Sequence, residues 1–445
     1  MIVEQRTIVE RRTVLMICRA LVLVLPVTCG PTVAQAQHDA EIQARYTEEI
    51  SALSADERVQ AAMDHVIAIE PQSRRDLVEL TEIPAPPFQE QDRAKRFAEM
   101  LREAGLSEVS IDDVGNVIGR RPGRNGDRVI AYSAHLDTVF PAGTDVTVRF
   151  DDEKMYAPGI GDNTRGLVAV LGVLRALESA DIETMADVLF VGNVGEEGLG
   201  DLRGVKHLFR DGAPRIDTLI AVDGSDSSRI VFGGVGSHRY RVTFRGPGGH
   251  SWSAFGLANP HHALGRAIAI FDDNAPTVTS IGEKTSYSIG RIGGGTSINS
   301  IPFESWMEVD MRSGSQDKLD DIDAVLQAAL EQALQEENAA RLDGPELTVD
   351  VERVGTRPAA QGDDQSAVVQ RALAATAAFG IQPELQISST DANLPISKGI
   401  PAVTMSRGGL SGDAHSPDEW WQNKDGHVGI QIGILTLLAE AGLAD

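Results

Sequence analysis

The sequence predicts an α/β fold, with a main domain built on a mixed, largely parallel β-sheet flanked by helices and a smaller inserted α+β domain. Between residues 74 and 234, short β-rich runs alternate with helical patterns, as in domains with a parallel sheet. From 237 to about 354 the pattern changes to alternating strands and two long helices. The length of 445 residues also exceeds what one hydrophobic core usually supports, roughly 250 to 300 residues.

We expect residues 37–236 and 356–445 to form the main domain and residues 237–355 to form the insertion. Continuous apolar runs predict strands that are buried on both faces. In the insertion, residues 240–244 alternate between polar and apolar side chains, which predicts a strand with one buried face. The main-domain strands are expected over 129–134, 188–191, 219–222 and 401–405, its helices over 167–176, 367–378 and from 429 onward, and the helices of the insertion over 261–271 and 319–334.

The N-terminus has the pattern of a signal peptide over residues 1–36. Arg11, Arg12 and Arg19 precede an apolar run, and Ala34-Gln35-Ala36 follows as a cleavage signal. The apolar run is shorter than the ~20 residues of a membrane helix, so a retained anchor is the weaker alternative and no stable membrane insertion is expected. We expect a secreted or periplasmic protein, with Sec and twin-arginine export both open.

Cysteine content and charge exclude some classes of function and argue against others. Cys18 and Cys29 both precede the predicted cleavage point, so a thiol nucleophile, a thiolate ligand and a disulfide are excluded for the mature chain. Asp and Glu number 65 against 40 Lys and Arg, which gives a formal net charge of -25. Because nucleic acids bind through positive charge, this balance argues against a nucleic-acid partner.

Polar side chains follow several predicted strands at the point where each strand ends. His135 and Asp137 follow the run 129–134, the pair Glu196-Glu197 follows 188–191, and Asp223 follows 219–222. In open α/β sheets, ligands bind beyond the carboxyl ends of the strands, so these groups are expected near one another. An Asp beside a His ligand can fix its tautomer, and an adjacent Glu pair can hold a metal with one acid while the other exchanges a proton.

Two further residues complete a set of metal ligands. Asp162 lies in a glycine-rich turn before a helix, where it is either an N-cap or a carboxylate that bridges two cations. His415 lies in the loop between the last strand and the closing helix. Two imidazoles and three carboxylates suit a pair of Zn²⁺ ions, although Co²⁺ and Mn²⁺ accept the same ligands. The expected ligand set is His135, Asp162, Glu197, Asp223 and His415.

From about Arg74 to the C-terminus, the chain resembles the co-catalytic dizinc hydrolases that include peptidase T, carboxypeptidase G and aminoacylase. The resemblance implies that His135 and His415 each bind one metal and that Asp162 bridges both. It also implies that Glu197 and Asp223 complete the two sites, that Glu196 is the general base and that Asp137 supports His135. The motifs that carry it are HLDT, GIGDNTRG, GEEG, VDGSD, GPGGHS and DAHSPDEW.

The same resemblance gives the insertion a role as a lid and dimerisation domain. In this family a lid histidine reaches the active site of the partner subunit and polarises the scissile carbonyl, and His250 in the GPGGHS motif matches it. Asn299 and Arg312 match lid positions that bind substrate. Arg312 could hold a carboxylate with two parallel hydrogen bonds. A homodimer formed through the lid is therefore expected.

These observations predict a secreted dinuclear zinc metallopeptidase that hydrolyses amide bonds of short peptides, with an aminopeptidase or a di- or tripeptidase favoured. An N-acyl amino acid deacylase, a glutamate-type carboxypeptidase and a catalytically inactive binding protein are the alternatives. A carboxypeptidase or deacylase needs a cation for the substrate carboxylate, whereas an aminopeptidase needs an acid for a free amine. The chain departs from commoner family forms at residues 163–165 and 420–421, which bears on the choice of substrate.

Overall fold

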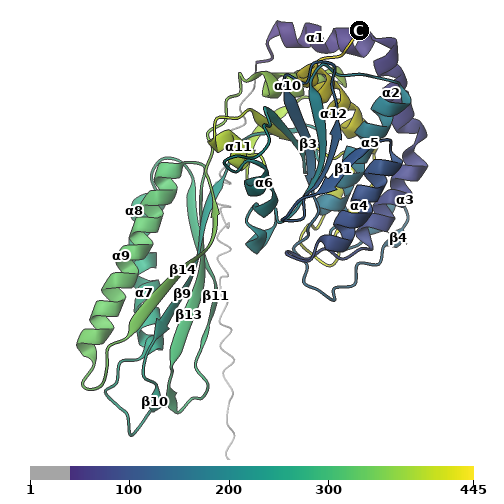
Figure 1. Cartoon of the computed structure of the whole chain (residues 1–445). Helices are drawn as coiled ribbons and strands as arrows, with labels where there is room; N and C mark the ends of the chain where they lie inside the picture. The colour runs from purple at the N-terminus through teal and green to yellow at the C-terminus, as the bar shows by residue number, and fades with distance from the viewer. Residues whose placement is uncertain (1–40) are drawn as a thin grey trace, which may run out of the picture. The chain divides into compact units, whose positions relative to one another are not determined.

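The computed structural model describes residues 41–445, so the predicted signal peptide and both cysteines lie outside the described residues. Its largest sheet has eight strands in the order β1-β2-β6-β3-β7-β16-β8-β15 (Figure 1). The pairs β3-β6, β3-β7, β7-β16 and β8-β15 are parallel, and the other three are antiparallel. The sheet is mixed and largely parallel, as predicted. Its strands are β1 (Glu108–Ile111), β2 (Val117–Arg121), β3 (Val129–His135), β6 (Asp187–Asn193), β7 (Thr218–Val222), β8 (Arg229–Gly234), β15 (Glu384–Ser388) and β16 (Ala402–Met405).

Side chains of β3 alternate between two hydrophobic cores on opposite faces of this sheet. Ile130 and Tyr132 belong to the larger core, which α4, α5, α10 and α12 cover, whereas Ala131 belongs to a smaller core under α6 and α11. Burial on both faces explains why these strands are continuously apolar. The helices of this domain are α1 (Ala44–Ala55), α2 (Glu57–Ala68), α3 (Glu70–Thr81), α4 (Gln91–Glu103), α5 (Gly166–Ser179), α6 (Arg203–Leu208), α10 (Ala367–Ala378), α11 (Asn393–Ser397) and α12 (Gly426–Ala441).

The insertion is a four-stranded antiparallel sheet in the order β11-β13-β9-β14, with α7 and α9 packed on one face (Figure 1). Along β13, buried and half-buried residues alternate over all ten positions, which gives the sheet one core-facing side. β14 continues to Arg357, because its pairing with β9 extends to that residue. The domain boundaries at 237 and 355 stay predictions. The elements of the insertion are β9 (Gly236–Arg245), α7 (Pro260–Asn274), α8 (Pro276–Thr279), β11 (Thr285–Gly294), β13 (Glu304–Ser313), α9 (Gln316–Ala340) and β14 (Thr348–Arg357).

Two small sheets carry loops that matter for the site. One has the order β17-β18-β5-β4, and its hairpin between β17 and β18 contains His415. The other pairs β10 with β12 at the tip of the insertion in Figure 1. The remaining bounds are β4 (Arg149–Asp151), β5 (Lys154–Tyr156), η1 (Ile160–Arg165), η2 (Gly198–Gly200), β10 (Gly249–His250), β12 (Ser300–Ile301), β17 (Leu410–Gly412) and β18 (Trp420–Gln422).

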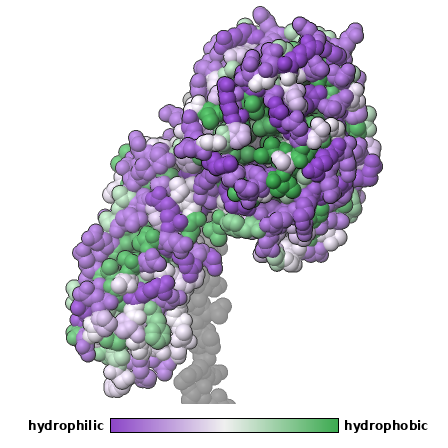
Figure 2. Space-filling view, viewed as in Figure 1, coloured by the Kyte–Doolittle hydropathy of each residue, from purple (hydrophilic) through white to green (hydrophobic). Residues whose placement is uncertain are grey.

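The surface is predominantly polar. Hydrophilic residues cover most of the face shown in Figure 2, in keeping with the excess of acidic residues in the sequence. Within residues 41–445, none of the helices combines the length and the apolar character that crossing a bilayer requires.

Candidate metal centre

The predicted ligands gather beyond the carboxyl ends of three neighbouring strands. His135 is the last residue of β3, Asp223 directly follows β7, and Glu197 lies four positions after the end of β6. Because β6, β3 and β7 are adjacent and parallel, these ends meet at one edge of the sheet. The hairpin of the small sheet brings His415 to the same place, where it lines one pocket with Asp162, Glu197 and Asp223.

Asp162 lies between the two histidines. Its Oδ1 is 3.2 Å from Nε2 of His135, and its Oδ2 is 3.3 Å from Nε2 of His415. His415 Nε2 also lies 3.0 Å from Oε1 of Glu197. The alternative role of Asp162 as an N-cap is not realised, since α5 begins after Arg165. One carboxylate oxygen directed at each histidine is the arrangement that a bridging ligand requires.

Two buried atoms of this group identify it as a cation site. His135 Nε2 and Asp162 Oδ1 have no hydrogen-bond partner among the described residues, although both are inaccessible to solvent. Nδ1 of His135 lies 3.1 Å from the backbone carbonyl of Asp137, which fixes the proton on Nδ1 and leaves the Nε2 lone pair free. Ligand atoms of His135, Asp162 and Glu197 also lie within 4.8 Å of one another. The chemistry and spacing of these donors fit a divalent metal.

Electrostatics keep the bridging carboxylate ionised. Burial opposes ionisation of Asp162, but His135, His415 and Arg407 outweigh it and hold the pKa of Asp162 well below its usual value. Hydrogen bonds to Asp162 and to Glu197 raise the pKa of His415 to about 10. These neighbours therefore favour the ionised form of Asp162.

Asp137 positions the Glu pair more directly than it positions His135. Its Oδ1 accepts the backbone N–H of Glu196 and its Oδ2 accepts that of Glu197. Its Oδ1 is 3.6 Å from His135 Nδ1, which is longer than a hydrogen bond. The predicted support of His135 therefore comes mainly from the backbone carbonyl of Asp137.

Glu196 is buried in the pocket and paired with an arginine. Nη1 of Arg357 donates to Oε1 of Glu196 at 2.8 Å, and Nη2 contacts the backbone carbonyl of Glu196. Burial raises the pKa of Glu196 to about 8, although Arg357 opposes this shift. A carboxyl whose pKa lies near neutrality suits a group that must accept and return a proton.

Asp223 is shared with a second arginine. Nη1 of Arg407 donates to Oδ1 of Asp223 at 2.9 Å and lies 3.8 Å from Oδ1 of Asp162. Asp223 thus faces the pocket beside Asp162, as predicted, but one of its two oxygens is engaged by a guanidinium.

Three residues of the insertion were predicted to serve the site, and the structure places only Arg312 in the metal pocket. Arg312 lines the metal pocket, whose volume is about 310 Å³, and its Nε donates to Asp310 at 2.7 Å. His250 and Asn299 do not line this pocket. They lie together at the tip of the insertion, where β10 pairs with β12 and the N–H of Ser251 donates to the carbonyl of Asn299.

Three functional residues escaped the sequence analysis. Arg357 is the last residue of β14. Arg407 follows the strand at 401–405, at the same kind of strand end that identified Asp223. Glu419 is fully buried and accepts the backbone N–H groups of residues 159, 161 and 162, so it holds the loop that carries Asp162. Its place inside the DAHSPDEW motif, close to His415, was the available signal for Glu419.

One residue from each of the two segments that depart from commoner family forms packs against the other. The Arg165 guanidinium carbon lies 4.7 Å from the ring centroid of Trp421, and both side chains are buried. Nη2 of Arg165 also donates to the carbonyl of Gly426 at 2.9 Å. Neither Arg165 nor Trp421 lines the metal pocket. Arg165 and Trp421 therefore join the two segments in one buried packing contact.

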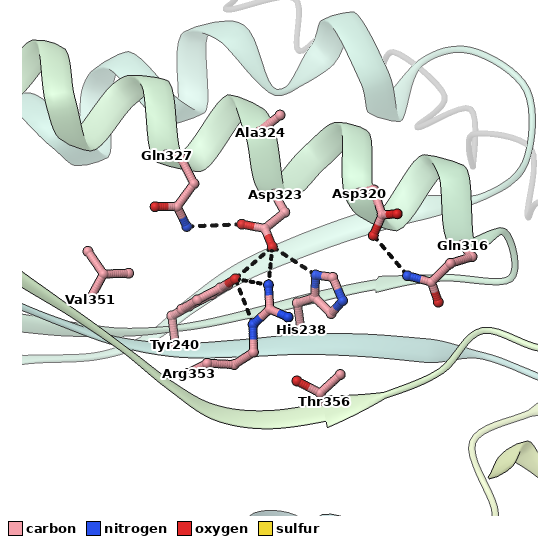
Figure 3. A pocket seen from close by; sticks show the side chains of 10 residues that line it. All are labelled: His238, Tyr240, Gln316, Asp320, Asp323, Ala324, Gln327, Val351, Arg353 and Thr356. Carbon is pink, nitrogen blue, oxygen red and sulfur yellow. Dashed lines mark hydrogen bonds and ion pairs between the residues drawn. The ribbon is translucent and has the colours of Figure 1, made fainter.

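A second pocket lies between α9 and the sheet of the insertion (Figure 3). Asp323 lies at its centre. Its Oδ2 lies 2.9 Å from His238 Nδ1 and accepts hydrogen bonds from Tyr240 at 2.6 Å and Arg353 at 2.7 Å. Its Oδ1 accepts a hydrogen bond from Gln327 at 3.0 Å. Both carboxylate oxygens are satisfied by the protein. This cluster therefore joins α9 to the sheet.

Known proteins share this fold. Over 161 residues the chain is 35% identical to the LysW-lysine/LysW-ornithine hydrolase of Pyrococcus abyssi, an alignment that covers 36% of this chain and 42% of that protein, less than half its length. The aminopeptidase PepT of Bacillus cereus superposes with a TM-score of 0.66 at 22% identity, over 83% of this chain and 98% of that one. The YXEP protein of Bacillus subtilis, a dinuclear metal-binding peptidase, gives 0.58 at 18% identity, over 84% and 99%.

A family model extends the likeness over most of the chain. The model of peptidase family M20/M25/M40 matches residues 131–439. This range contains both histidines of the metal centre, Asp162 and the Glu pair. The resemblance drawn from the sequence motifs is confirmed. The chain belongs to peptidase family M20/M25/M40.

Proposed function

We propose that this enzyme uses two divalent metal ions to hydrolyse a short peptide or an N-acyl amino acid whose free carboxylate lies close to the bond that is cut. The charges of the pocket carry this proposal. Three arginines line it, Arg239, Arg312 and Arg357, and its lining acids are Glu196 and the ligands Asp162, Glu197 and Asp223. Among the described lining residues, no acid is left over for a substrate amine. The balance favours a carboxylate-binding enzyme over the aminopeptidase that the sequence motifs suggested.

The two arginines from the insertion are held in place for this role. Nε of Arg312 and Nε of Arg239 donate to the two oxygens of Asp310, at 2.7 and 2.9 Å. Arg239 also donates from Nη1 to the carbonyl of Gly198, next to the Glu pair. Arg312 keeps its terminal nitrogens free of hydrogen bonds to described residues, so its guanidinium can hold a carboxylate.

The chain's own groups divide the reaction between them. When bound, the two metals lower the pKa of a water molecule and polarise the substrate carbonyl. Glu196 would take the proton of that water and pass it to the leaving amine, with Arg357 fixing its position. Zn²⁺ is our expected metal because imidazole and carboxylate ligands suit it, and Co²⁺ and Mn²⁺ are the alternatives.

Blocking one end of the substrate at a time tests the substrate class. Dipeptides and N-acetyl amino acids would be compared with the same compounds carrying a C-terminal amide, with Zn²⁺ present and after chelation. We expect amidation to abolish turnover and N-acetylation to be tolerated. Turnover that survives amidation but is lost on N-acetylation would instead indicate an aminopeptidase.

We also propose that the enzyme acts as a homodimer in which His250 serves the partner subunit's site. Three large apolar side chains near His250 are exposed, namely Trp252 at 86%, Phe255 at 82% and Phe303 at 61%, and a second copy would cover them. The place of His250 at the tip of the insertion, away from the lining of its own metal pocket, supports the same arrangement.

Mixing two inactive variants tests this arrangement. The chain with His250→Ala keeps its own Glu196, and the chain with Glu196→Gln keeps its own His250. If His250 acts across the dimer, the mixed dimer contains one complete site and regains activity of up to about half that of the wild type. No recovery, in a mixture shown by light scattering and mass spectrometry to form heterodimers, would show that His250 acts within one chain. An active His250→Ala enzyme would show that His250 does not act at all.

We propose in addition that the chain is exported and cleaved after Ala36. The support is the basic, apolar and small-residue pattern of residues 1–36. N-terminal sequencing of the protein expressed from its full sequence in a bacterial host would begin at Gln37 in the periplasmic fraction. An uncleaved chain that stays in the cytoplasm would contradict export.

A further inference from the structure

Arg407 is held at a fixed position beside Asp223 by the backbone of the central sheet. β16 and β7 are parallel neighbours, with Met405 paired to Val222. The hydrogen bonding continues past both strands: the N–H of Asp223 donates to the carbonyl of Met405 at 2.8 Å, and the N–H of Arg407 donates to that of Gly224 at 2.9 Å. The two side chains therefore leave the same edge of the sheet at a set spacing.

The guanidinium of Arg407 is buried beside two predicted metal ligands, and Nη1 also donates to Oδ1 of Asn163 at 3.5 Å. Its side chain is 4% exposed. Nη1 donates to Oδ1 of Asp223 at 2.9 Å and lies 3.8 Å from Oδ1 of Asp162, while Nη2 donates to Oγ of Ser411 at 3.3 Å. Oδ2 of Asp223 has no hydrogen-bond partner among residues 41–445. Arg407 thus occupies one oxygen of Asp223 and leaves the other for an ion.

The other metal position has no comparable neighbour. Within the described chain, the nitrogen within 4.0 Å of the Glu197 carboxylate belongs to His415, and no arginine approaches that carboxylate so closely. An arginine keeps its positive charge at any pH at which the protein is folded. A dication bound by His135, Asp162 and Asp223 would share the Asp223 carboxylate with a guanidinium. At the other position, formed by Asp162, Glu197 and His415, the neighbouring Arg357 is hydrogen-bonded to Glu196 and not to a ligand.

We propose that Arg407 makes the two metal positions unequal. By taking one oxygen of Asp223 and adding a fixed positive charge, it weakens ion binding at the position of His135 relative to the position of His415. The chain then loads its ions in two separable steps, with the His415 position filled first. This inference rests on the two-metal centre of the proposed function and assigns Arg407 as a positioning residue.

Titration of the metal-free full chain with Co²⁺, followed by calorimetry and by visible absorption, tests the proposal. We expect two binding steps in the wild type. In Arg407→Gln the weaker step should tighten at least ten-fold while the tighter step stays unchanged, and Arg407→Lys should retain the two-step pattern. Arg165→Gln is the matched control: it removes another buried guanidinium, which contacts Gly426 and Trp421 and no ligand, and should leave both steps unchanged.

Two ligand variants assign the steps and keep the test valid if Arg407→Gln does not fold. Asp223→Asn should remove the weaker step and His415→Ala the tighter one. The proposal is overturned if Asp223→Asn removes the tighter step, if a folded Arg407→Gln keeps the wild-type ratio of affinities, or if the wild type binds two ions with equal affinity. A wild type that binds fewer than two Co²⁺ ions would instead refute the two-metal centre itself.

Discussion

The Asp137 carboxylate accepts the backbone N–H of Glu196 at 3.0 Å, and its second oxygen accepts that of Glu197 at 2.8 Å. The backbone carbonyl of the same residue contacts Nδ1 of His135 at 3.1 Å. A single buried residue thus orients the first histidine ligand, one acidic ligand and the proposed general base. Because these groups come from different strand ends, Asp137 sets their relative positions.

Replacing Asp137 by Asn should therefore damage both stability and catalysis. In the variant, the amide NH₂ would replace an oxygen that accepts a backbone N–H in the wild type. That N–H would lose its acceptor, which lowers the free energy of unfolding by about 1–3 kcal/mol. We expect kcat/KM to fall roughly ten- to hundred-fold, as for other groups that orient metal ligands. Urea unfolding and steady-state kinetics measure the two effects.

Asp56→Asn is the matched control for this variant. Asp56 also accepts two backbone N–H groups, from Arg58 and Val59, but it caps α2 and does not line the metal pocket. It should lose stability and keep kcat/KM. If the two variants lose equal stability and both keep full activity, Asp137 has no positioning role.

Arg312 should govern substrate affinity. Arg312→Gln removes a charged hydrogen-bond donor for the substrate carboxylate, which is worth about 1.5–3 kcal/mol and corresponds to roughly a ten- to hundred-fold rise in KM. Arg291→Gln is the control, because Arg291 is an exposed arginine of the same sheet that pairs with Glu308 at 3.0 Å. An unchanged KM in Arg312→Gln would show that Arg312 does not bind the substrate carboxylate.

The ligands of the metal centre could be predicted where a local sequence pattern determines their position in the fold. His135, Glu197 and Asp223 each follow an apolar run, and parallel pairing brings such ends together. Asp162 was found from its glycine-rich turn, and His415 from its loop between the last strand and the closing helix. Local patterns did not reveal that Asp137 binds the Glu pair, because that contact joins residues 59 and 60 positions apart in the sequence.

Residues that act through long-range contacts were missed or misread. The pairing of Arg407 with Asp223 spans 184 positions and that of Arg357 with Glu196 spans 161, so no sequence window contains both partners. The same limit applies to Arg165. Its position beside the bridging Asp suggested a role in substrate choice, but its side chain turns away from the site and packs on Trp421.

Asp323 should make the stability of the insertion depend on acid. Burial opposes its ionisation, but hydrogen bonds from His238, Tyr240 and Gln327 outweigh it and lower the pKa of Asp323 to about 2 (Figure 3). Because this pKa lies below the unfolded value of about 3.9, the stabilisation is complete above pH 4 and is lost as the pH falls towards 2. Urea unfolding of wild type and Asp323→Asn should give curves that differ at pH 5 and converge towards pH 2.

Asp320→Asn is the control for this experiment. Asp320 lines the same pocket, and its carboxylate accepts a hydrogen bond from Gln316 at 2.8 Å. Its replacement should leave the acid dependence of the wild type intact. A constant stability difference between wild type and Asp323→Asn over the whole pH range would contradict the assignment.

Metal removal should lower thermal stability. Ions that bind the folded chain and not the unfolded one add about 2.7 kcal/mol at a concentration one hundred times their Kd. Chelation should therefore lower Tm, and added Zn²⁺ should restore it in the wild type. A chain with both His135→Ala and His415→Ala should show no such recovery. An unchanged Tm on chelation of a protein shown to contain metal would contradict ligation by these residues.

The most direct test of the central claim is the hydrolysis of dipeptides and N-acetyl amino acids by the wild type and by Glu196→Gln, both loaded with Zn²⁺. In this variant the amide oxygen of the new side chain would still accept a hydrogen bond from Arg357, but the amide could not take a proton. We predict that kcat falls by roughly 10²–10⁴ with metal content unchanged. Full activity of the metal-loaded Glu196→Gln enzyme, or no hydrolysis of any of these substrates by the metal-loaded wild type, would contradict the proposed function.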